Sequence, residues 1–158
     1  MAVFSRRAEL QWEGDISDGS GQVVAGSGAF GVGAIFPSVV GDPAGKTTPE
    51  ELLAASHATC YGIGLRSMIA RRGGRARRVS VTATVTAEKG PQGIRIQSSH
   101  LTGVVDDLEG IDESQLQQLA RETEERCTIS VAIRGTVSVS SEVRLGSLNS
   151  ATGSRDAH

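Results

Sequence analysis

The chain has 158 residues, of which 38% are hydrophobic and only 3% aromatic, and its formal net charge is −2. This length suits one domain with its own core, and the slightly acidic balance argues against a nucleic-acid or membrane-surface partner. No apolar run is long enough to cross a membrane, and residues 1–10 lack the apolar segment of a signal peptide, so we expect a cytoplasmic protein. Because aromatic residues are scarce, the core must be built from aliphatic side chains, and such a thin core favours burial in an oligomer.

The N-terminal part is predicted to consist of short strands joined by tight turns. Within residues 5–35, SRRAELQWEG alternates, GDISDGSG is a cluster of turn residues, and QVVAGSGAFGVG continues as a strand and a glycine-rich bend. Residues 36–47 are expected to form an irregular loop that leads into the next element.

A long helix is predicted over residues 48–74. Thr48 is a suitable N-cap, Pro49 fits the first helical position, and Glu51 completes a capping box. Gly73 supplies the left-handed conformation that ends a helix. The apolar residues surround the helix axis, so we expect burial on most sides.

The interior of this helix contains Gly62, Gly64 and one cysteine, Cys60. Each glycine costs about 1 kcal/mol relative to alanine. The pair therefore indicates a place where another backbone packs very close.

A hairpin follows the helix. Residues 79–87 alternate as a strand, residues 90–93 form the turn, and residues 94–105 return as the partner strand. The long helix is the expected cover for the apolar face of this hairpin. That face carries Val79, Val81, Ala83 and Val85.

A second helix is predicted to begin at Asp112, which forms a capping box with Gln115, and to run to about Arg126. Cys127 ends its buried stripe, which also contains Leu116, Leu119 and Thr123. Residues 136–145 form the last strand. We therefore predict an α+β fold in a single domain over residues 1–146 and a disordered tail over residues 147–158.

The two cysteines, Cys60 and Cys127, are the candidate chemical groups. A purely structural disulfide between them is improbable in a reducing cytosol. They are either two buried free thiols or a catalytic thiol pair. The three histidines, His57, His100 and His158, do not have metal-ligand spacing, so no metal and no cofactor are expected.

The order and surroundings of these residues resemble the OsmC/Ohr family of thiol peroxidases. The resemblance lies in the segment TPEELLAASHATC, the strands that follow it, the segment ERCTIS and a last strand. Near the N-terminus, WEGDISDGSG is similar to the opening of the OsmC branch. The resemblance spans residues 5–145. It implies the OsmC-like fold, with antiparallel sheets packed around a long central helix in an intertwined homodimer.

The resemblance also implies a function in oxidative or osmotic stress defence. Organic hydroperoxides, and also hydrogen peroxide, would be the substrates. Cys60 matches the peroxidatic cysteine, which peroxide converts to a sulfenic acid, and Cys127 matches the resolving cysteine that condenses with it. An external dithiol, of which a lipoyl protein is one candidate, would restore both thiols.

Glu50 matches the glutamate that holds an arginine beside the thiolate in this family. Glu50 and Cys60 are ten residues apart, which is about 15 Å along one helix. If Glu50 takes part in the site, we expect it to come from a second subunit. Alternatively, Glu50 only interacts with the positive end of the helix dipole.

The sequence departs from the family pattern at the arginine itself. Lys46 is the only cationic residue in the loop before Thr48, and the first hairpin has no arginine. Arg6 and Arg7 lie further upstream. Lysine lacks the bidentate fork of arginine. We therefore expect a weakly activated thiolate, or a partner that comes from elsewhere in the dimer.

His57 lies one turn before Cys60 on the same helix face and is a candidate base or thiolate support, or else a satisfied interior residue. Two other functions remain open. In one, the dimer binds a small hydrophobic or thiol-reactive ligand and is catalytically weakened. In the other, it is a purely structural module.

Overall fold

The structure, a computed structural model, describes residues 1–36 and 44–146 and has the predicted α+β composition. The chain divides into two compact units, Met1–Leu53 and Ala54–His158. Part of the predicted loop and the predicted disordered tail lie outside the described residues. The single domain over residues 1–146 stays a prediction.

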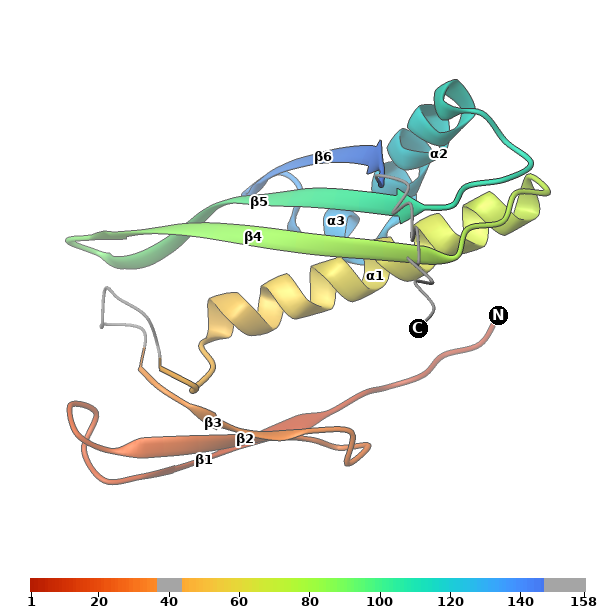
Figure 1. Cartoon of the computed structure of the whole chain (residues 1–158). Coiled ribbons are helices and arrows are strands. Elements are labelled where there is room, and N and C mark those ends of the chain that lie inside the picture. The colour runs from red at the N-terminus through yellow and green to blue at the C-terminus, as the bar shows by residue number, and fades with distance from the viewer. Residues whose placement is uncertain (37–43, 147–158) are drawn as a thin grey trace, which may run out of the picture. The chain divides into compact units, whose positions relative to one another are not determined.

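The first unit contains a three-stranded antiparallel sheet of order β1-β2-β3 (Figure 1). Its strands are β1 (Ala8–Glu13), β2 (Ser20–Ala25) and β3 (Gly31–Ala34). The prediction of short strands with tight turns is thereby confirmed. Gly14 and Gly28 have positive φ angles in the two turns, a conformation that glycine adopts without strain.

The predicted long helix is α1 (Pro49–Arg71). The Thr48 hydroxyl accepts a hydrogen bond of 3.3 Å from the Glu51 backbone N–H, as an N-cap should. The second half of the predicted box is different, because the Glu51 carboxylate accepts a bond of 2.8 Å from the Thr47 hydroxyl. Gly73, with φ of 78°, follows the helix end as predicted.

The helix α1 buries one stripe rather than most of its surface. The buried residues His57, Tyr61, Leu65 and Ile69 follow one another at four-residue steps. Ile63, on another face, is 67% exposed. Within the second unit, the prediction of burial on most sides is therefore wrong, because the elements of that unit cover only one face of α1.

The two helix glycines approach side chains and not another backbone. A Cβ atom on Gly62 would lie 3.4 Å from the Val81 side chain, and one on Gly64 would lie 3.1 Å from that of Thr123. The prediction of close packing holds, but the expected close backbone is absent at both described positions.

The second unit contains the strands β4 (Arg78–Gly90), β5 (Gly93–Asp106) and β6 (Ser138–Leu145), in the order β4-β5-β6 (Figure 1). The β4–β5 hairpin is antiparallel as predicted, with a register shift between Thr86 and Ala87. However, β6 is parallel to β5, so this sheet is mixed and not antiparallel throughout. The long connection between β5 and β6, which contains two helices, returns the chain to the start of β5 and makes this direction possible.

The second predicted helix is α2 (Glu113–Arg126). Its capping box is complete: the Asp112 carboxylate accepts from the Gln115 N–H at 2.8 Å, and the Gln115 side chain accepts from the Asp112 N–H at 2.9 Å. Cys127 then separates α2 from α3 (Thr128–Ile133), a short helix that the sequence did not predict.

The core of the second unit forms between α1, the sheet and α2. It confirms that α1 covers the apolar face of the β4–β5 hairpin and that the α2 stripe ends at Cys127. Among the described residues, no helix has the length and hydropathy required to span a bilayer. The buried core consists of Tyr61, Leu65, Ile69, Ala76, Leu101, Val105, Leu116, Leu119, Ala120, Cys127 and Val143, with Val79, Val81 and Ala83 packed against it.

The first testable prediction concerns the cap that fixes the start of α2. Asp112→Ala removes the side-chain acceptor of the capping box and should lower the free energy of unfolding by about 1 kcal/mol. Ser114→Ala, in the same exposed turn, is the matched control and should change it by less than about 0.5 kcal/mol. Urea denaturation of both variants measures the difference, and equal stabilities would contradict the assigned cap.

Candidate active site

The fold brings the two cysteines together. Cys60 lies in the middle of α1 and is half-buried, whereas Cys127 is buried at the junction of α2 and α3. Both are free thiols, and the Cys127 side chain is close enough to Cys60 to lower the pKa of Cys60 as a hydrogen-bond donor. The Cys60 sulfur also lies 3.3 Å from the Thr128 hydroxyl. A close approach of the two sulfurs is what disulfide formation between them requires.

The surroundings give the two thiols opposite acidities. Burial raises the pKa of Cys60, but hydrogen bonds from the Cys127 thiol, the Thr128 hydroxyl and the backbone N–H groups of Ile129 and Thr128 outweigh it, so the pKa is lowered. Burial and the hydrogen bond to Cys60 together raise the pKa of Cys127. Cys60 is therefore the more acidic thiol of the pair, and Cys127 is the less acidic one.

A depression of about 440 Å³ opens beside the two cysteines. Ile63 and Met68 give it an apolar wall, and Arg71 and Arg126 stand at its edge. Within residues 1–36 and 44–146, neither arginine forms an ion pair or a side-chain hydrogen bond. The full lining is Cys60, Ile63, Gly64, Ser67, Met68, Arg71, Thr123, Arg126, Cys127 and Thr128.

His57 directs both ring nitrogens away from Cys60. Its Nδ1 lies 2.7 Å from the Ser99 hydroxyl, and its Nε2 lies 2.8 Å from the Ser130 hydroxyl. All three side chains are fully buried. Burial lowers the pKa of His57, although the nearby Glu124 carboxylate opposes this shift. Burial therefore favours the neutral imidazole, and the interactions of both nitrogens are with serine hydroxyls. The role of His57 as a base or thiolate support for Cys60 stays a prediction.

The other predicted site residues belong to the first unit. Glu50 lies half-buried in the first turn of α1 and, within the described part of the chain, forms no side-chain hydrogen bond or ion pair. Lys46 is exposed. Arg6 donates to the Ser5 carbonyl and lies 4.9 Å from the centre of the Phe4 ring. The role predicted for Glu50 stays a prediction.

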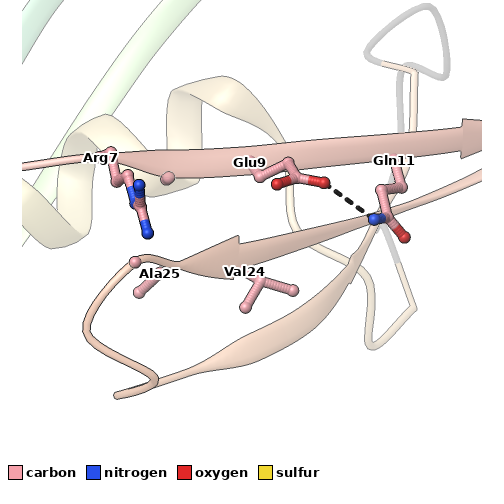
Figure 2. A pocket seen from close by; sticks show the side chains of 7 residues that line it. Arg7, Glu9, Gln11, Val24 and Ala25 are labelled. Carbon is pink, nitrogen blue, oxygen red and sulfur yellow. Dashed lines mark hydrogen bonds between the residues drawn. The ribbon is translucent and has the colours of Figure 1, made fainter.

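The first unit has a pocket of its own on the β1–β2 ribbon, with a volume of about 470 Å³ (Figure 2). It contains Arg7 and Glu9, and the Gln11 amide donates to the Glu9 carboxylate at 2.8 Å. No cysteine or histidine lines it. Nowhere in the described chain do three or more metal-binding side chains gather. The cysteine pair is therefore the candidate active site.

Sequence reasoning missed the hydroxyl groups that surround the cysteines. Thr128 contacts Cys60, and Ser130 interacts with Cys127 and His57. No local signal identifies these two residues, because Thr128 and Ser130 meet Cys60 and His57 only through tertiary packing. Ser99 likewise had no signal, since it is one polar residue in a long strand.

Sequence comparisons identify the family of the chain. A family model described as OsmC-like protein matches residues 41–142. The peroxiredoxin OsmC of Escherichia coli is 27% identical over 147 residues, which cover 90% of this chain and 99% of that protein.

Solved structures have the same fold. An organic hydroperoxide resistance protein OsmC from Legionella pneumophila has a TM-score of 0.71 at 26% identity, covering 90% of this chain and 98% of that one. The organic hydroperoxide resistance protein OhrB of Bacillus subtilis has a TM-score of 0.67 at 24% identity, covering 90% of this chain and 100% of that one. At this identity, it supports the fold alone. Since the family model spans well over half of the sequence, the chain belongs to the OsmC-like family.

Proposed function

We propose that this protein is a thiol peroxidase that reduces organic hydroperoxides with Cys60 as the peroxidatic and Cys127 as the resolving cysteine. The observation that carries the proposal is that two free cysteines, distant in the sequence, line one depression with apolar side chains, and the opposite directions of their pKa shifts agree with it. Family membership and the peroxiredoxin name of the Escherichia coli relative support a peroxidase or redox role in general.

The first step needs a thiolate that an alkyl hydroperoxide can reach. The Cys60 sulfur attacks the terminal peroxide oxygen, the O–O bond breaks, and the alkoxide leaves and takes a proton to become the alcohol. The half-buried position of Cys60 and the apolar wall of Ile63 and Met68 suit an alkyl group. These features favour organic hydroperoxides over hydrogen peroxide, which gains nothing from an apolar surface.

In the second step, Cys127 attacks the sulfenic sulfur of Cys60, which gives the disulfide and water. An external dithiol then reduces the disulfide. A lipoyl protein is one candidate reductant, and its identity, like the cytoplasmic location and the role in stress defence, stays a prediction.

Neutral hydrogen-bond donors offer one way to stabilise the thiolate without the arginine that the family uses. The Thr128 hydroxyl and the N–H groups of Thr128 and Ile129 all point to the Cys60 sulfur. Thiolates are stabilised by such donors, although a positive charge would contribute more. This donor set favours catalysis over the alternative of a ligand-binding dimer, for which a raised pKa of Cys60 would be expected.

We further propose a homodimer, as the sequence predicts. Ile63 beside Cys60 is 67% exposed, and the β1–β3 sheet leaves Leu10 57% exposed. Exposed apolar groups of this size favour a protein interface. The half-buried Glu50, which has no described partner, would then complete the site of a second subunit.

The peroxidase proposal predicts different losses for the two cysteines. Cys60→Ser should reduce consumption of an alkyl hydroperoxide, followed with a dithiol reductant, to the uncatalysed background, because the nucleophile is gone. Cys127→Ser should still form a sulfenic acid in the first turnover, detectable by dimedone labelling. A Cys60→Ser variant that consumes peroxide at the wild-type rate would refute the proposal.

The donor set predicts that Thr128→Val raises the pKa of Cys60. Near pH 7, which lies below the ordinary thiol pKa of about 8.5, a lower pKa means more thiolate. Loss of a hydrogen bond worth about 1 kcal/mol should therefore slow alkylation of Cys60 about fivefold at this pH. Well above both pKa values, the rates of variant and wild type should converge.

Thr128→Ser keeps the hydroxyl and is the matched control, so its alkylation profile against pH should remain that of the wild type. A Thr128→Val profile that coincides with it would show that the hydroxyl does not stabilise the thiolate.

The predicted origin of Glu50 can be tested with mixed subunits. Glu50→Gln and Cys60→Ser homodimers should each be impaired. If Glu50 acts in the neighbouring subunit, co-refolding the two variants creates one intact site per mixed dimer and restores peroxidase activity.

The control is co-refolding of Glu50→Gln with the Cys60→Ser, Glu50→Gln double variant, which leaves no Glu50 and should restore nothing. Equal activity in both mixtures, or a monomer by sedimentation, would contradict the intersubunit site.

A further inference from the structure

A fully buried histidine lies behind the cysteine pair, and the peroxide step does not use it. His57 on α1 is held between Ser99 of β5 and Ser130 of α3, at 2.7 Å and 2.8 Å from its two ring nitrogens. Burial of an imidazole costs free energy unless both nitrogens have partners. The two serines satisfy this requirement. An apolar set of side chains at these positions would be buried at a lower cost in free energy, so we expect the polar set to have a function.

Ser130 connects this histidine with the resolving cysteine. Its hydroxyl, which interacts with Nε2 of His57, is also close enough to the Cys127 side chain to affect the pKa of that thiol. A continuous polar line therefore runs from Ser99 through His57 and Ser130 to Cys127. The line reaches the thiol that stays protonated, whereas the Cys60 sulfur has its own separate donors at Thr128 and Ile129.

We propose that His57, acting through Ser130, positions the Cys127 thiol and receives its proton when Cys127 attacks oxidised Cys60. His57 is thus a positioning residue of the resolving step and not of the peroxide step. The inference rests on the proposed function and adds a role that the peroxidase proposal alone does not require.

The proton balance of the step is simple. The Cys127 S–H proton passes to the Ser130 oxygen while the Ser130 hydroxyl proton passes to Nε2 of His57. The new S–S bond forms, the S–O bond of the Cys60 sulfenic acid breaks, and the departing hydroxide takes a proton from solvent to become water. His57 then returns its proton to solvent, so the net products are the disulfide and one water molecule.

The charges around His57 suit a temporary proton. From α2, the Glu124 carboxylate favours the protonated imidazole. Glu124 is itself held by the Arg134 guanidinium at 3.3 Å and by the Ser141 hydroxyl of β6. On α1, Cys60 and Tyr61 follow His57 by one helical turn, and Cys127 directly precedes α3. Burial keeps the resting imidazole neutral, which leaves it free to accept.

An aromatic disulfide reagent that releases a coloured thiolate tests this step without any peroxide. Cys60 attacks the reagent first and releases one thiolate, at a rate proportional to the reagent concentration. Cys127 then attacks the mixed disulfide on Cys60 and releases the second thiolate, at a rate independent of that concentration. Stopped-flow absorbance separates the two phases.

His57→Gln and Ser130→Ala should each slow the second phase about tenfold or more, in the range of general base catalysis, and change the first phase less than about twofold. The double variant should be no slower than the slower single variant, because the two residues act in series. Tyr61→Phe is the matched control. It removes another buried polar contact of α1, the bond from Tyr61 to the Ala120 carbonyl, and should leave both phases unchanged.

An unchanged second phase in both variants, or equal slowing of both phases, would overturn the inference. Slowing of the second phase in Tyr61→Phe to the same extent would assign the effect to packing and overturn it too. If His57→Gln fails to fold, the rate of the second phase in Ser130→Ala, which removes a single oxygen, tests the inference alone. A wild type that shows both phases but reduces no hydroperoxide would refute the proposed function instead.

Discussion

The contact between one stripe of α1 and the elements of the second unit holds the candidate site together. Tyr61, Leu65 and Ile69 of this stripe are fully buried against the sheet and α2. Each contributes about 2 kcal/mol of hydrophobic stabilisation. The same helix orientation brings Cys60 to the start of α3, where it meets Thr128 across 68 residues of sequence. A helix rotated by one residue would lose both the packing and the meeting of the thiols.

The surroundings of the two sulfurs shift their pKa values in opposite directions. Donors at the start of α3 favour charge on Cys60, while burial keeps the proton on Cys127. A peroxidase needs this division, because a nucleophile must be charged before the peroxide arrives and a resolving thiol need not be. His57 connects to the second thiol only, which explains why a histidine one turn before Cys60 does not contact it.

Much of the fold could be predicted because its signals are local. The caps at Thr48 and Asp112 and the alternation in β4 fixed the starts of both main helices and the buried face of the hairpin. Other features have no local signal. Alternation in residues 138–145 does not encode strand direction, so the parallel pairing of β6 was missed, and α3 is too short to show a helical period.

The candidate site was partly predictable for the same reason. The two cysteines could be singled out by residue type and by their surrounding motifs. Their hydroxyl partners could not, because Ser99, Ser130 and Thr128 become neighbours of His57 and Cys60 only through tertiary packing. The apolar residues on every face of α1 also hid its single buried stripe, since periodicity cannot distinguish a face covered by the same chain from one left exposed.

The central claim is that Cys60 and Cys127 of one chain react with each other after Cys60 is oxidised. Peptide mass mapping without reductant, after one equivalent of an alkyl hydroperoxide, tests it most directly. The account predicts a peptide containing Cys60 linked to one containing Cys127, two hydrogen atoms lighter than the free pair. Unmodified thiols, or a stable Cys60 oxide with Cys127 still free, would contradict it.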